Sequence, residues 1–373
     1  MSRRTTKLLK AALSALHYSG AARVAAPLTG RNGVIFMLHQ VGPGTPRAFN
    51  PNGILKVTPE FLDSVIRHIR AAGFDIVGLD EVKARLNEAP GSRPFAVFTL
   101  DDGYKDNREF AYPVFKRHNV PFTIYVPTAY ADGHGELWWL ALEEALRKLQ
   151  RVEIKRDGAT RVYRLRIDAE KKFAFHDIYW WLRQIPEDRA RAVVRDLAAK
   201  AGFEVAGLCR DLVMSWDEIR ALSKDPLVMI AAHTTNHFAL AKLPVETARR
   251  EMADSIARVE KELGKPVRHF SYPYGDEESA GEREFEIARE LGLETAVTTR
   301  KGLLRMKHAH ALTALPRLSL NGAYQDVRYV KALLSGLPFA LRDGVKGALG
   351  IVRGRSPSGA LEAVSHPASA STR

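Results

Sequence analysis

Short apolar runs alternate with amphipathic segments along most of the chain, and this alternation limits the fold more than any other feature. The runs with the length and composition of buried strands are 34–38, 74–77, 95–100, 122–126, 227–232, 267–272 and 295–299. The segments between them carry apolar residues at helical spacing, as in 59–72 and 252–263. Strands that alternate with helices form parallel βαβ units, so we expect a parallel α/β sheet, either open or closed into a barrel.

Polar residues follow three of these predicted strands. Asp101 and Asp102 come directly after 95–100, His233 and His237 come after 227–232, and Tyr274 comes shortly after 267–272. In parallel α/β folds the functional side chains gather at the carboxyl ends of the strands. We therefore expect these five residues to lie at one end of the sheet.

The residue types at this expected site point to a metal. A carboxylate and two imidazoles are a common ligand set for a catalytic divalent ion that keeps positions open for water and substrate. An Asp-Asp-Gly turn, or a pair of histidines four residues apart, means little alone. Because both motifs follow buried strands, we interpret them as one site, in which the second carboxylate is left to act as a base.

The alternation stops between residues 133 and 214. This segment is charged and helix-rich, and it holds Trp138, Trp139, Trp180 and Trp181, four of the five tryptophans. We predict a helical insertion that forms a cap or subdomain. Tryptophan faces stack on sugar rings in some sites, but anchoring the core of the insertion is the more common role and is the interpretation we favour.

The net charge of +13 lies mainly at the two ends of the chain. Residues 1–59 contain no Asp or Glu, and residues 60–340 are close to neutral. A nucleic-acid groove needs a basic stripe on the folded surface, so we expect no nucleic acid as a partner. The single cysteine, Cys209, cannot form an internal disulfide, and we interpret it as a core residue.

The basic N-terminal segment contains a short amphipathic stretch at 7–16. We expect it to pack on the body as a helix or to form a frayed arm, and the alternative is peripheral binding to an anionic membrane. Lys10 interrupts the apolar stretch, which is short for a signal core, and no window is long and apolar enough to span a bilayer. The expected location is therefore the cytoplasm, at the inner membrane face if the basic segment binds lipid.

The strand-end motifs resemble those of the polysaccharide deacetylases, the carbohydrate esterases that share a NodB homology domain. Residues 98–104, Phe-Thr-Leu-Asp-Asp-Gly-Tyr, are similar to the family's Thr-Phe-Asp-Asp-Gly motif, with Leu100 in place of Phe. Residues 233–237 match its His-Ser/Thr-x-x-His motif, and 270–275 resemble its Arg-x-Pro-Tyr-Gly motif. Met-Leu-His at 37–39 is similar to the Met-Tyr-His of many members. The resemblance covers about residues 33–320 outside the insertion.

This resemblance implies an irregular (β/α) barrel of about seven parallel strands. It implies that Asp102, His233 and His237 bind a divalent metal, usually zinc and in some members cobalt or nickel. Asp101 would be the general base that takes a proton from the attacking water, and the backbone N–H of Tyr274 would help to hold the oxyanion. The implied activity is removal of N-acetyl groups from a GlcNAc-containing oligo- or polysaccharide, as in a chitooligosaccharide deacetylase.

Two positions depart from the family pattern. Ser271 stands where the family has the arginine that orients the catalytic aspartate, and Arg317 is our candidate to supply that charge from another position, after the last predicted strand. The late Leu-x-His motif, which provides the general acid in the family, has no clear copy. His308 and His310 lie nearby in sequence but fit a surface loop, and His39, at a strand end, is another candidate.

Metal-dependent N-deacetylation of a glycan is the leading hypothesis. A first alternative keeps the barrel and acts as an amidohydrolase on a C–N bond of a small molecule, which a closed cap would favour. A second alternative is a catalytically impaired barrel that binds glycan, which the missing arginine and the unassigned acid would favour.

The expected division of the chain follows from these patterns. It comprises a basic N-terminal segment (1–32), a NodB-like deacetylase barrel (33–132 and 215–330), the insertion (133–214), a C-terminal helical extension (331–353) and a disordered tail (354–373).

Overall fold

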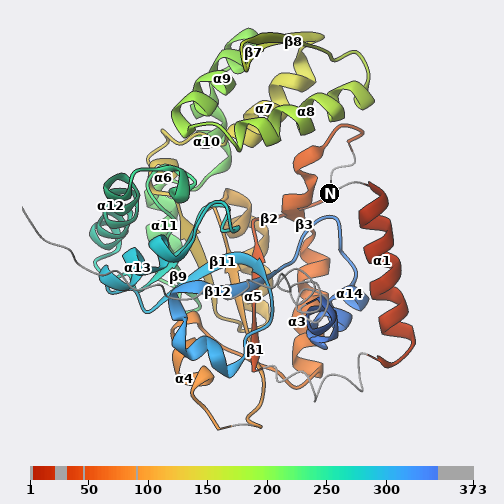
Figure 1. Cartoon of the computed structure of the whole chain (residues 1–373). Coiled ribbons are helices and arrows are strands. Elements are labelled where there is room, and N and C mark those ends of the chain that lie inside the picture. The colour runs from red at the N-terminus through yellow and green to blue at the C-terminus, as the bar shows by residue number, and fades with distance from the viewer. Residues whose placement is uncertain (1–2, 22–31, 45–46, 90, 343–373) are drawn as a thin grey trace, which may run out of the picture.

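The computed structural model describes residues 3–21, 32–44, 47–89 and 91–342, and its central element is a ring of parallel strands (Figure 1). The ring consists of β1 (Gly33–Leu38), β5 (Phe95–Leu100), β6 (Phe122–Val126), β9 (Val228–Ala232), β10 (His269–Ser271), β11 (Thr295–Lys301) and β12 (Leu315–Ser319). Neighbouring strands pair in parallel, and β1 pairs with both β12 and β5, which closes the sheet. The expected barrel of about seven parallel strands is confirmed.

The strand that closes the barrel corrects one expectation. Sequence analysis places Arg317 after the last strand, whereas Arg317 lies within β12, which pairs with β1 and β11. Pro316 also lies in this strand. Because proline cannot donate a ladder hydrogen bond, a run that contains it does not look like a barrel strand. Arg317 is therefore part of the barrel itself and not of a loop.

Helices and short elements join the barrel strands. The helices are α3 (Pro59–Ala71), α4 (Val82–Leu86), α5 (Tyr112–Arg117), α6 (Thr128–Ala131), α11 (Trp216–Leu222), α12 (Val245–Leu263) and α13 (Glu282–Glu290). The short elements are β2 (Gln40–Val41), η2 (Pro51–Leu55), β3 (Lys56–Val57), β4 (Asp75–Ile76), η3 (Leu79–Glu81), η4 (Asn107–Ala111), η5 (Leu240–Lys242), η6 (Met306–His310) and η7 (Leu312–Ala314). Thr58 caps α3 by accepting a hydrogen bond from the N–H of Phe61, and Gly264 ends α12 with a φ of 65°.

Side chains of the barrel strands alternate between two apolar layers. Ile35 of β1 and Val97 of β5 belong to a cluster inside the barrel, and both are fully buried. Val34 and Phe36 belong instead to the larger cluster that the surrounding helices cover. A strand has a period of two, so the inward series of β5 continues from Val97 to Asp101 just past the end of the strand.

The insertion lies between β6 and β9, over one end of the barrel (Figure 1). It contains α7 (Trp138–Lys148), β7 (Arg151–Arg156), β8 (Ala159–Arg164), α8 (Asp168–Leu182), α9 (Glu187–Lys200) and α10 (Val205–Leu212). The antiparallel hairpin of β7 and β8 is an addition to the expected helices. Trp138, Trp139 and Trp181 are at most 5% exposed in the core of the insertion, which also holds Cys209, whereas Trp180 is 46% exposed.

Two helices from opposite ends of the chain pack together on the side of the barrel (Figure 1). They are α1 (Arg3–Tyr18) and α14 (Val327–Leu334), and residues 337–342 are also helical. Leu13 of α1 is buried, whereas Leu8 is 71% exposed. The expected tail at 354–373 and residues 343–353 of the expected extension lie outside the described residues. Among the described helices, none combines the length and apolar character needed to cross a bilayer.

Candidate active site

Asp101 and Asp102 lie at the mouth of the barrel, directly after β5. Both carboxylates are almost completely buried, at 2% and 1% exposure. Asp102 has a φ of 73°, and Gly103 after it has a φ of 66°. A non-glycine residue adopts the left-handed region at a cost, so the surrounding structure must hold Asp102 there. Such strained positions cluster at functional sites, which agrees with the expected role of this turn.

Arg317 binds Asp101 through two hydrogen bonds inside the barrel mouth. Its Nη1 donates to Oδ1 and its Nη2 to Oδ2 of Asp101, each at 2.7 Å. The Nη2 also donates to the Oγ of Ser271 at 3.0 Å, and the Nε donates to the carbonyl of Thr298 at 2.9 Å. Ser271 is the position where the family motif has its arginine. The guanidinium of Arg317 therefore reaches Asp101 from β12, and it also contacts Ser271, the residue that replaces the motif arginine.

Opposing influences act on the pKa of Asp101. Burial raises the pKa, because a desolvated carboxylate is less stable than the neutral acid. The charge of Arg317 and its hydrogen bonds lower the pKa and outweigh burial, so the pKa of Asp101 lies below its ordinary value. Asp101 is thus an ionised carboxylate held in a fixed orientation, as a general base requires.

Asp102, His233 and His237 form a buried group whose ligand atoms all lie within 4.8 Å of one another. The Oδ1 of Asp102 lies 3.6 Å from the Nε2 of His233 and 3.3 Å from the Nε2 of His237. The Nδ1 of His233 bonds to the carbonyl of Ser271 at 2.5 Å, which leaves Nε2 directed toward Asp102. Burial lowers the pKa of His233 to about 4, so this imidazole is neutral near pH 7.

This group fits a divalent cation. Among the described residues the Oδ1 of Asp102 has no hydrogen-bond partner, although it is fully buried. An unpartnered buried carboxylate oxygen is costly unless a ligand satisfies it. Neutral imidazole and ionised carboxylate are the forms that bind metals. The carbonyl of Ser271 holds the Nδ1 of His233, which leaves its Nε2 available as a ligand. The three residues expected as metal ligands therefore do meet in space.

The loop from His233 to His237 is held by residues that sequence analysis does not identify. The Oε2 of Glu251, on α12, accepts hydrogen bonds from the N–H groups of Thr235 at 3.1 Å and Asn236 at 2.8 Å. Arg191, on α9, donates to the carbonyl of His237 at 3.2 Å and is 2% exposed. A signal for Glu251 existed, because helical spacing places an acidic residue on the buried face of α12 beside Met252.

Tyr274 and Gly275 form a tight turn after β10. Their φ values are 61° and 57°, and a Cβ on Gly275 would lie 2.6 Å from the backbone nitrogen of Thr299, so only glycine fits there. Thr299 fixes the turn because its Oγ1 donates to the carbonyl of Tyr274 at 2.5 Å and its N–H donates to the carbonyl of Gly275 at 3.0 Å. Among the described residues the N–H of Tyr274 donates to no other backbone group.

Side chains of the insertion pack directly against this site. The Nε1 of Trp138 donates to the hydroxyl of Tyr274 at 2.7 Å. The ring of Trp139 lies 5.0 Å from the ring of His237, and the guanidinium of Arg183 lies 3.7 Å from the ring centre of Tyr274. The insertion is therefore part of the site and not a separate domain beside it.

A cavity of about 1100 Å³ is lined by all of the expected site residues except Arg317. Asp101, Asp102, His233, His237, Tyr274 and His39 line it. Arg317 lies behind Asp101 and is not in the lining. His308 and His310 belong to η6 and are also absent from the lining. Leu304, two residues before η6, pairs with Gly33 at the start of β1, so these two histidines lie toward the end of the barrel opposite the site.

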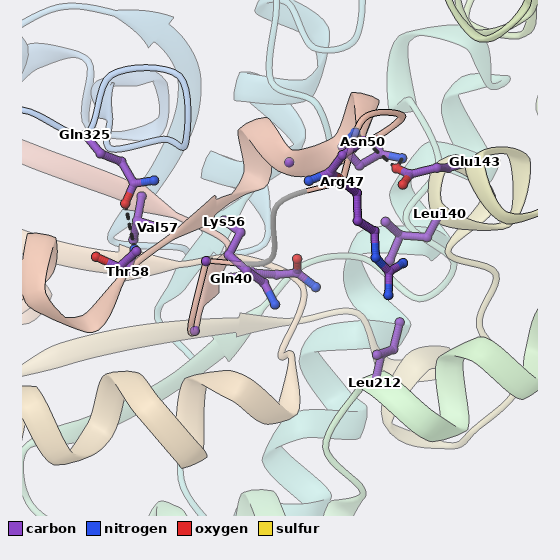
Figure 2. Close-up of a pocket in the computed structure, with 14 residues that line it drawn as sticks. Gln40, Arg47, Asn50, Lys56, Val57, Thr58, Leu140, Glu143, Leu212 and Gln325 are labelled. Carbon is purple, nitrogen blue, oxygen red and sulfur yellow. Dashed lines mark hydrogen bonds between the residues drawn. The ribbon is translucent and has the colours of Figure 1, made fainter. Parts of the chain in front are cut away.

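A second cavity, of about 590 Å³ (Figure 2), shares Asn50, Asn52 and Gly53 with the lining of the first. The Oε2 of Glu143 accepts hydrogen bonds from the N–H and the side chain of Asn52, at 3.1 and 2.8 Å. At the other side of this cavity the N–H of Thr58 donates to the Oε1 of Gln325 at 2.7 Å (Figure 2). None of the expected site residues lines this second cavity, so we assign the chemistry to the first.

A closed parallel barrel with an Asp-Asp pair and two histidines at its strand ends defines the class of NodB-type barrel deacetylases. The comparison with family models agrees, because the polysaccharide deacetylase model matches residues 88–296, more than half of the 373 residues. The chain belongs to the polysaccharide deacetylase family. The family resemblance expected from the motifs is confirmed, and membership supports a carbohydrate deacetylase, which is a hydrolase of C–N bonds.

Several solved structures share the fold. The Streptococcus pyogenes deacetylase PplD, solved in complex with acetate, is 17% identical with a TM-score of 0.54, covering 81% of this chain and 97% of that one. IcaB from Ammonifex degensii is 17% identical with a TM-score of 0.50, covering 82% and 98%. The de-N-acetylase from Aggregatibacter actinomycetemcomitans is 14% identical with a TM-score of 0.50, covering 80% and 99%. No curated protein matches the chain.

Proposed function

We propose that this protein is a metal-dependent hydrolase that removes N-acetyl groups from a GlcNAc-containing oligo- or polysaccharide. The observation that carries the proposal is the buried group of Asp102, His233 and His237 beside an Asp101 that Arg317 holds ionised. Family membership supports the acetylated carbohydrate as substrate. Zinc is the first candidate for the ion, because two imidazoles and one carboxylate with open positions suit it, and cobalt and nickel are the alternatives.

Each residue of the site has a distinct role in this proposal. Asp102, His233 and His237 would hold the ion, which supplies a Lewis acid that polarises the acetamide carbonyl and makes a water molecule more acidic. Asp101 accepts the proton of the attacking water, and Arg317 fixes the orientation of the Asp101 carboxylate. The backbone N–H of Tyr274 donates a hydrogen bond to the oxyanion.

Protonation of the leaving amine is assigned to His39. His39 follows β1 and lines the cavity that also contains Asp101 and Asp102. His308 and His310 lie outside the cavity lining, so they do not compete for this role.

Mass spectrometry of products from acetylated glycans and small cyclic amides tests the proposal. We expect N-acetylglucosamine oligomers to lose acetyl groups in the presence of Zn²⁺ or Co²⁺, while the cyclic amides remain intact. Replacement of Asp102 or His233 by Ala should abolish both metal retention and acetate release. Unchanged oligomers together with hydrolysed cyclic amides would favour the small-molecule amidohydrolase instead, and glycan binding without acetate release would favour an impaired barrel.

A further inference from the structure

Helix α8 of the insertion is apolar on two faces. Its inner face holds Phe175, Ile178 and Trp181, which are at most 8% exposed in the core of the insertion. On its outer face Phe173 is 68% exposed and Trp180 is 46% exposed. A surface helix ordinarily has polar residues on its outer side, so two large exposed aromatic side chains on one helix call for a partner.

The outer face of α8 opens into the cavity of the candidate active site. Phe173, His176 and Trp180 occur at a spacing of three and four residues, which places them on one face of the helix. All three line the cavity of about 1100 Å³ that also contains Asp101 and His233. We call these three residues the α8 face. It spans about 10 Å along the helix, given a rise of 1.5 Å per residue.

An aromatic stack connects the α8 face with the turn at Tyr274. Tyr179 of α8 stacks on Trp138, with ring centres 5.0 Å apart and planes at 27°. Trp138 in turn donates its hydrogen bond to the hydroxyl of Tyr274. The rings of Tyr179 and Trp180 lie edge to face at 5.3 Å. The α8 face therefore has a fixed position relative to the residues that would bind the scissile acetamide.

We propose that the α8 face is a sugar-binding subsite, which holds a part of the glycan remote from the acetamido group that is cleaved. The inference rests on the proposed function for the identity of the ligand. A cavity of 1100 Å³ exceeds the range of about 300–1000 Å³ typical of sites for one small ligand, so a single sugar at the metal ligands leaves much of it free. Aromatic faces suit the apolar faces of sugar rings, and Lys172 and His176 provide polar partners for hydroxyl groups.

The consequence is a preference for substrates longer than one sugar. Contacts remote from the reacting bond raise affinity for a long substrate and can also be used to orient it. A monosaccharide at Asp102 and His233 fills only part of this cavity, so a longer glycan can make additional contacts with the α8 face. We therefore expect kcat/KM to increase from N-acetylglucosamine to its pentamer, and we expect the increase to depend on Trp180.

Calorimetric titration of the full-length chain carrying Asp101→Asn with the N-acetylglucosamine pentamer tests the subsite without turnover. We expect an added Trp180→Ala to weaken binding by roughly tenfold, and an added Trp180→Phe, which keeps an aromatic ring, to retain affinity within about threefold. Val162→Ala is the matched control, because Val162 is 50% exposed on the same insertion but lies outside the cavity. Equal pentamer affinity with and without Trp180→Ala, or no pentamer binding at all, would overturn the inference.

Acetate release by the chain with Asp101 intact separates this inference from the proposed function. Pentamer binding that depends on Trp180 without acetate release would leave the subsite in place and contradict the proposed function. Acetate release with equal kcat/KM for monomer and pentamer would support the function and overturn the subsite. Sedimentation with anionic phospholipid vesicles is the third measurement. Loss of vesicle binding in Trp180→Ala, with pentamer affinity unchanged, would show that the face binds a membrane instead.

Discussion

The mouth of the barrel and the insertion above it hold the same site in different ways. At the mouth, buried charged groups fix one another, as in the two hydrogen bonds from Arg317 to Asp101. The insertion contacts the site through aromatic and arginine side chains, as in the hydrogen bonds from Trp138 to the Tyr274 hydroxyl and from Arg191 to the carbonyl of His237. Charge pairs of this kind orient reacting groups, whereas exposed rings such as Trp180 leave a surface for ligand. On the proposed function, the barrel carries the chemistry, and on the inferred subsite, the insertion selects the substrate.

Among substitutions that leave the metal ligands intact, the largest effect is expected at His39, and it would show that the barrel carries the acid–base chemistry. His39→Gln should lower kcat by about 10²–10⁴-fold, because it removes the proposed general acid. The metal content should not change, since His39 is not one of the three grouped ligands. Steady-state kinetics and elemental analysis measure both quantities. His308→Gln is the control, and a loss of kcat in that variant with none at His39 would show that the acid has been misassigned.

Arg317→Gln tests whether the barrel mouth depends on its buried charge pair. We expect kcat to fall by about 10²-fold as Asp101 loses its orientation, and stability to fall by about 3–5 kcal/mol because a buried carboxylate loses its partner. The pKa of Asp101 should rise, since burial then acts without the opposing guanidinium. The acid limb of the kcat/KM profile therefore moves to higher pH. An unchanged profile would contradict the role given to Arg317.

The same pair also sets a pH dependence of stability in the unaltered protein. The folded-state pKa of Asp101 is lowered, so the ionised pair contributes stability above the unfolded-state pKa of about 3.9, and this contribution is lost as the pH falls through the folded-state value. Arg317→Gln should lack this contribution. Chemical denaturation of both proteins between acidic and neutral pH measures their free energies of unfolding. The difference between these two free energies should become smaller toward low pH.

The smallest effect is expected where the insertion meets the barrel. Trp138→Phe removes the hydrogen bond to the Tyr274 hydroxyl and should cost about 1–3 kcal/mol of stability with a kcat reduced only a few-fold. Trp216→Phe is the matched control. The Nε1 of Trp216 donates a hydrogen bond of 2.7 Å to Asp132, and neither residue lines the cavity. Thermal denaturation should show losses in both variants, and kinetics should show a change only in Trp138→Phe. Equal changes of kcat in Trp138→Phe and Trp216→Phe would contradict a specific role of the insertion at the site.

The sequence predicts the barrel and its motifs well because the signal there is local. Buried strands leave continuous apolar runs, and the chain places Asp101 and His233 directly after two of them. Parallel pairing then brings these strand ends together with no further information from the sequence. The sequence marks Arg317 as a candidate only by its charge, and the pairing of β12 with β1 shows how it reaches Asp101.

The insertion is predicted less well because its details depend on packing. Asp157-Gly158 is a recognisable hairpin turn, with both residues at positive φ between β7 and β8, so this element had a signal. No sequence signal distinguishes Trp180, which is exposed, from Trp181, which is buried. They are neighbours on α8, and which ring is exposed to the cavity depends on how the helix docks. Arg191 likewise supports the site across a distance that no local pattern encodes.

Acetate release from the N-acetylglucosamine pentamer, followed as the chain is depleted of metal and then titrated with Zn²⁺, tests the central claim most directly. The account predicts that depletion abolishes release and that activity returns in proportion to bound zinc up to one ion per chain. His233→Ala should neither retain the ion nor regain activity. Full acetate release from metal-free protein, or a His233→Ala chain that keeps both metal and activity, would contradict the assignment of chemistry to Asp102, His233 and His237.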